Sequence, residues 1–162
     1  MLIKILITIL GVFFLLAFES FFMTLFSFSI FIIITFILID KVDWKKWIIL
    51  ITLVSLLIDI MIHRNLGVTL LTVSLSTASL YLLFIIIPRK KIILSYIPYF
   101  LSIFLFYILI TALSPLVQSG VFGILTWRIL LFSVIKSFIS ALLIWGINIF
   151  LDNFRSNKDL LI

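Results

Sequence analysis

The chain has 162 residues, of which 65% are hydrophobic and 11% are charged, and its mean hydropathy is +1.50. Soluble domains carry roughly 25% charged residues, so this composition cannot cover the exterior of a water-soluble fold and predicts a protein surrounded by lipid. The absence of Cys excludes disulfides, thiolate metal sites and a Cys nucleophile. The formal charge of +6 lies in short loops between apolar runs, so we expect membrane lipid rather than nucleic acid as the partner, and no cofactor or metal.

Unbroken apolar runs predict helices rather than barrel strands, which alternate apolar and polar residues. The sequence therefore predicts an all-α integral membrane protein, a compact bundle of about six transmembrane helices with short loops in one polytopic domain. The predicted spans are 3–18, 21–39, 47–63, 66–87, 92–113 and 124–151. Only Glu19-Ser20 separates the first two, which form either a tight hairpin or one bent helix. No small-x-small cleavage site follows the first span, so we expect a retained anchor rather than a signal peptide.

Basic residues gather on one side of this predicted topology. They are Lys4, Lys41, Lys45, Lys46, Arg89, Lys90, Lys91, Arg155 and Lys158. On the other side, only Arg64 lies in a predicted loop. Because basic loops stay in the cytoplasm, both termini are expected there, and Trp44, Trp47 and Trp127 lie where interfacial aromatics are expected.

Four ionisable residues fall within or at the ends of the predicted spans, where charge is costly and a functional hypothesis is the default. They are Glu19, Asp59, Arg128 and Lys136. Their approximate depths predict two ion pairs, Asp59 with Lys136 and Glu19 with Arg128. The alternative is that each side chain snorkels to the interface or meets water in a crevice.

Small hydroxylated residues form a stripe in the fourth predicted span: Thr69, Thr72, Ser76 and Ser79. Their spacing places them on one helix face, where they favour close helix packing, with a substrate-lining surface as the alternative. A similar cluster of Ser133, Ser137 and Ser140 surrounds Lys136. His63, beside Arg64, is interpreted as a solvated interfacial residue rather than a catalytic base, and we expect no enzyme activity.

The stretch from Ser55 to Val68 reads SLLIDIMIHRNLGV. It resembles the rod shape-determining protein MreD family, in which an aspartate near the end of one span is followed by a short loop and a Leu-Gly pair that opens the next. Asp59 and Gly67 match these positions, while Ser55 stands where the family usually has glycine. The resemblance implies a non-enzymatic subunit of the bacterial cell-elongation machinery in the cytoplasmic membrane. It also implies contact with an MreC scaffold and, through it, with MreB, RodA and a penicillin-binding transpeptidase.

The same residues predict a structural role. Asp59 is expected to cap or anchor the outer turn, and Gly67 to allow a positive φ or a close backbone approach. A second hypothesis is that the chain resembles the substrate-binding S component of energy-coupling-factor vitamin importers, which has a similar size and number of spans. In that case, the stripe from Thr69 to Ser79 and the buried charges would line a ligand pocket.

Overall fold

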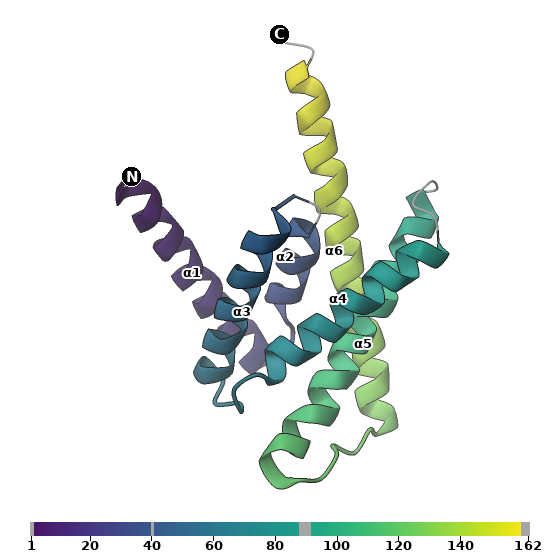
Figure 1. Cartoon of the computed structure of the whole chain (residues 1–162). Coiled ribbons are helices and arrows are strands. Elements are labelled where there is room, and N and C mark those ends of the chain that lie inside the picture. Colours follow the sequence, from purple (N-terminus) through teal and green to yellow (C-terminus); the bar gives the residue numbers. More distant parts are fainter. Residues whose placement is uncertain (1, 40, 88–91, 160–162) are drawn as a thin grey trace.

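The computed structural model describes residues 2–39, 41–87 and 92–159, with side chains described for 10–39, 41–87 and 96–151. These residues are all helical apart from turns and loops. The helices are α1 (Leu2–Phe26), α2 (Ile30–Leu38), α3 (Trp44–Met61), α4 (Val68–Ile86), α5 (Ile92–Ser119) and α6 (Trp127–Asp159). Consecutive helices run in opposite directions, so the start of α1 and the end of α6 lie at the same end of the molecule (Figure 1).

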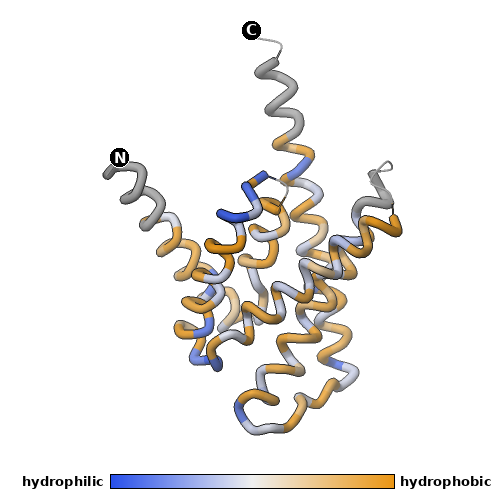
Figure 2. The backbone as a smooth tube through the Cα atoms, viewed as in Figure 1, coloured by the Kyte–Doolittle hydropathy of each residue, from blue (hydrophilic) through white to orange (hydrophobic). Residues whose placement is uncertain are grey.

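Three of the described helices are long and apolar enough to cross a membrane: Val68–Ile86, Tyr96–Ser119 and Trp127–Leu151. Apolar residues cover most of their length (Figure 2). The apolar stretch Leu10–Phe26 of α1 is shorter. The nine residues of α2 span about 14 Å, less than half of a hydrocarbon layer about 30 Å thick. The described helices therefore suggest a membrane protein whose elements differ in length, not six equal spans.

The predicted boundary between the first two spans is wrong. Helix α1 continues through Glu19 and ends at Phe26, and the break lies at Ser27, which has a positive φ of 49°. Ser29 then caps α2 by accepting a hydrogen bond from the Ile32 N–H at 3.4 Å. A carboxylate does not have to end a membrane helix when other groups of the protein form hydrogen bonds with it. Of the two predicted alternatives, a hairpin and one bent helix, the structure has the hairpin.

In the bundle, α4 packs on α5 and α3, α6 packs on α5 and α2, and α1 packs on α2 and α3. The hydroxyl stripe of α4 is part of this packing, because Thr69, Thr72 and Ser76 are buried. Ser79 is half-buried, and its Oγ lies 3.5 Å from Ser102 Oγ on α5. The stripe therefore serves helix packing, as predicted. The predicted break from Pro88 to Lys91 lies outside the described residues.

Candidate functional site

Asp59 caps the start of α4 from the last turn of α3. Its side chain is fully buried, and its Oδ2 accepts a hydrogen bond from the Gly67 N–H at 2.8 Å. The Thr69 N–H lies 3.2 Å from both carboxylate oxygens, and the Thr69 hydroxyl donates to Oδ1 at 2.5 Å. The first N–H groups of a helix have no partner within it, and Asp59 supplies that partner. Gly67 has a φ of 93°, so the predicted roles of both residues are confirmed.

Glu19 does the same for α2, from about two turns before the end of α1. Its buried carboxylate accepts hydrogen bonds from Ser29 Oγ at 2.6 Å, the Ile30 N–H at 2.7 Å and the Phe31 N–H at 2.8 Å. The Ser29 N–H donates to the Tyr107 hydroxyl on α5 at 3.1 Å. Sequence reasoning missed this cap, although a serine directly before the apolar run at 30–38 was the signal for a helix start.

The two predicted ion pairs are wrong. The described residues contain one ion pair, between Lys46 and Asp43 at 3.3 Å, and both of its side chains are exposed. Lys136 Nζ instead lies 5.7 Å from the centroid of the Tyr107 ring, and Arg128 is exposed. The reason is that backbone N–H groups and hydroxyls already donate hydrogen bonds to the Asp59 and Glu19 carboxylates. These donors lie at the start of the next helix, directly after the turn that follows each carboxylate.

The loop between α3 and α4 carries a partly buried cation, Arg64. Burial lowers the pKa of its guanidinium below the usual range, while the charges of Asp59 and, more weakly, Glu19 act in the opposite direction. Arginine remains a cation under such conditions. Its Nη1 is buried and has no hydrogen-bond partner. The neighbouring His63 is exposed, with a φ of 55°, in keeping with its predicted solvation.

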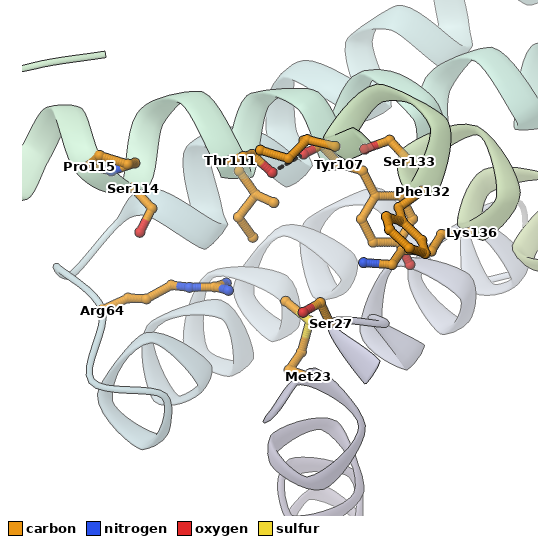
Figure 3. A pocket seen from close by; sticks show the side chains of 12 residues that line it. Met23, Ser27, Arg64, Tyr107, Thr111, Ser114, Pro115, Phe132, Ser133 and Lys136 are labelled. Carbon is orange, nitrogen blue, oxygen red and sulfur yellow. Dashed lines mark hydrogen bonds between the residues drawn. The ribbon is translucent and has the colours of Figure 1, made fainter. Parts of the chain in front are cut away.

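A cavity of about 360 Å³ opens between this loop, the α1–α2 turn and the facing sides of α5 and α6. Its polar lining consists of Ser27, Arg64, Tyr107, Thr111, Ser114, Ser133 and Lys136 (Figure 3). Its apolar lining includes Met23, Ile110 and Phe132. The fold thus brings two cations to one cavity, whereas Arg128 does not line it.

Comparison of the chain with models of protein families, with curated proteins and with solved structures finds no match.

Proposed function

We propose that the chain is a non-enzymatic, multi-pass scaffold subunit of the bacterial cell-elongation machinery, similar to MreD. The observation that supports this function is the joint from Asp59 to Thr69. Both Asp59 oxygens are engaged by groups of Gly67 and Thr69, so this buried carboxylate fixes the end of α3 against the start of α4. Such a joint suits a subunit that offers fixed helix faces to its partners.

The proposed topology has six helices in alternating directions, of which α2 is too short to cross the hydrocarbon layer alone, with both termini in the cytoplasm of a bacterial cell. It is supported by the exposed Lys41, Lys45 and Lys46, which adjoin the start of α3 at the same end of the molecule as the start of α1 and the end of α6 (Figure 1). The Arg64 loop lies at the opposite end. Reporter fusions to the C-terminus are expected to report a cytoplasmic location, and an extracytoplasmic signal would contradict the topology.

Partner binding is proposed to use the apolar helix faces, since the described loops are short. Helix α6 exposes a run of large apolar side chains: Leu131, Phe132, Val134, Ile135, Phe138 and Ile139. In the membrane such a face meets lipid or another helix. We propose that part of it contacts an MreC-like scaffold, which links the subunit to MreB, RodA and the transpeptidase.

Depletion and copurification in a rod-shaped host test this function. Depletion of the chain is expected to round the cells, and the tagged protein is expected to copurify with an MreC-like partner in mild detergent. At matched membrane levels, Asp59→Ala is expected to restore the rod shape of depleted cells only in part and to copurify less of the partner. Arg128→Gln, which removes an exposed charge, is expected to restore the shape and to copurify the partner as the wild type does. Normal cell shape on depletion, together with no such partner, would contradict the proposal.

The cavity gives one observation in favour of the second hypothesis, a substrate-binding subunit similar to those of vitamin importers. That hypothesis also requires the α4 stripe to line a pocket, but Thr72 and Ser76 are fully buried within the bundle and do not line the 360 Å³ cavity. We therefore rank it second. Copurification of a vitamin and an ATPase module, without an MreC-like partner, would reverse the order.

A further inference from the structure

The cavity between the α3–α4 loop and the α5–α6 pair holds two cations, and neither forms an ion pair within the described residues. We propose that this cavity is a binding site for a phosphate-bearing anion, with the phosphate held between Arg64 and Lys136. The phosphate belongs either to a lipid headgroup or to a soluble phosphate ester. This inference concerns a different part of the molecule from the Asp59 joint and does not rest on the proposed scaffold function.

Arg64 lacks an acceptor for part of its guanidinium within the described residues. Its guanidinium lines the cavity, and the buried Nη1 has no hydrogen-bond partner. A buried donor without a partner is costly, and native proteins satisfy nearly all of them. The neighbouring carboxylate of Asp59 is already occupied by Gly67 and Thr69. The Arg64 side chain points into the cavity (Figure 3) and forms no ion pair within the described residues, so an oxyanion in the cavity would supply its guanidinium with an acceptor.

Lys136 lies on the opposite side of the cavity from Arg64 (Figure 3). It enters the cavity from α6, and in Figure 3 its ammonium group and the Arg64 guanidinium point into the same space from opposite sides. Its contact with the Tyr107 ring, at 5.7 Å from the centroid, is a cation–π interaction that uses no acceptor oxygen. The three N–H donors of the ammonium therefore remain available for a ligand.

The lining fits phosphate in particular. Arginine offers a planar fork and lysine a point charge, a combination that suits a group with several charged oxygens. The hydroxyls of Ser114 and Ser133 add donors, while Met23, Ile110 and Phe132 form an apolar wall. A cavity of about 360 Å³ has room for the phosphate and part of the group that it esterifies. The ligand is thus expected to be amphiphilic.

Binding is tested on the purified full-length chain, with thermal unfolding followed by Trp fluorescence. One arm adds inorganic phosphate in a neutral detergent. The other compares vesicles of phosphatidylcholine alone with vesicles that also contain phosphatidic acid. At least one phosphate source is expected to raise the unfolding temperature of the wild type. Arg64→Gln and Lys136→Gln are each expected to weaken the apparent affinity about tenfold or more. The matched control, Arg128→Gln, removes an exposed cation outside the cavity and is expected to bind as the wild type does.

The arms separate the two sources and can overturn the proposal. Stabilisation by phosphatidic acid alone assigns a lipid headgroup, and stabilisation by inorganic phosphate assigns a soluble ester. No stabilisation of the wild type by either, or an equal loss of affinity in Arg128→Gln, overturns the site. If Arg64→Gln does not fold, Arg64→Lys keeps the charge and removes the fork. Arg64→Lys and Lys136→Gln are then each expected to bind phosphate more weakly than the wild type. Wild-type affinity in both of these variants overturns the proposal.

Discussion

Two helices of this protein start against a buried carboxylate from the preceding helix, but the two joints differ in how many groups share the task. At α2, Glu19 works together with the Ser29 side chain and the Tyr107 hydroxyl. At α4, the N-cap is Gly67, which has no side chain to offer, so Asp59 is the side chain that meets the first N–H groups. The buried carboxylate is therefore expected to contribute more to stability at the start of α4, where Asp59 has no capping side chain beside it, than at the start of α2.

The connection from α5 to α6 shows a third solution. There, the Gly123 N–H donates to the Ala112 carbonyl at 3.2 Å, and a Cβ at Gly123 would collide with the Thr111 carbonyl oxygen. This backbone contact fixes the loop four residues before α6 begins at Trp127, and no carboxylate takes part in it. Carboxylate capping is therefore a property of the α1–α2 and α3–α4 pairs within the described chain.

The largest effect is expected at Asp59. Asp59→Ala leaves the N–H groups of Gly67 and Thr69 and the Thr69 hydroxyl without their acceptor and removes a negative charge near Arg64, and we expect a loss of about 3–5 kcal/mol in the free energy of unfolding. Asp59→Asn keeps one acceptor oxygen and is expected to lose about 1–3 kcal/mol. Titration with denaturing detergent in mixed micelles measures both. A wild-type free energy of unfolding for Asp59→Ala would contradict the capping role of this carboxylate.

Glu19→Ala is expected to cost less, about 1–3 kcal/mol, because Ser29 and Tyr107 still meet α2. The same titration gives the value. Glu19→Gln, which retains an acceptor, serves as the conservative control and is expected to fall between the wild type and Glu19→Ala. A larger loss for Glu19→Ala than for Asp59→Ala would reverse the proposed ranking of the joints.

Gly67→Ala tests the backbone part of the second joint. With a φ of 93°, an alanine at this position is strained, and a loss of about 1–2 kcal/mol is expected. The matched control is Gly146→Ala within α6, where an added Cβ meets nothing within 4 Å and the helix gains up to about 1 kcal/mol. Equal effects of the two substitutions on the unfolding temperature would contradict a conformational role for Gly67.

The smallest effect is expected for Tyr107→Phe, which removes the hydroxyl that accepts from the Ser29 N–H. We expect a loss of about 0.5–1.5 kcal/mol. Because this hydroxyl serves the first joint, its loss should add to that of Asp59→Asn within about 0.5 kcal/mol. Strong coupling between Tyr107→Phe and Asp59→Asn in the detergent titration would show that the joints are not separate.

The sequence predicted the features that depend on neighbours along the chain. Composition gave the membrane character, and the separation between Asp59 and Gly67 is short enough for the turn itself to bring them together, so their roles were predictable. The hydroxyl stripe from Thr69 to Ser79 was also predictable, because helical periodicity alone places it on one face.

The misplaced break at Glu19 and the two wrong ion pairs have a common cause. Sequence reasoning paired charges with charges, whereas the strongest available partners for Glu19 and Asp59 were unpaired backbone N–H groups at the next helix start. A crevice at Lys136 was one alternative from the sequence, but the lining of the cavity and the place of Arg64 in it were not predictable, since the cavity forms from α1, α5, α6 and a loop far apart in the sequence.

A pair of double-mutant cycles tests most directly whether Asp59 is a helix cap rather than the partner of a distant cation. The first combines Asp59→Asn with Thr69→Val, and the second combines Asp59→Asn with Lys136→Gln. We predict a coupling free energy of about 0.5–3 kcal/mol in the first cycle and additivity within about 0.5 kcal/mol in the second. Additivity with Thr69 together with strong coupling to Lys136 would contradict the account.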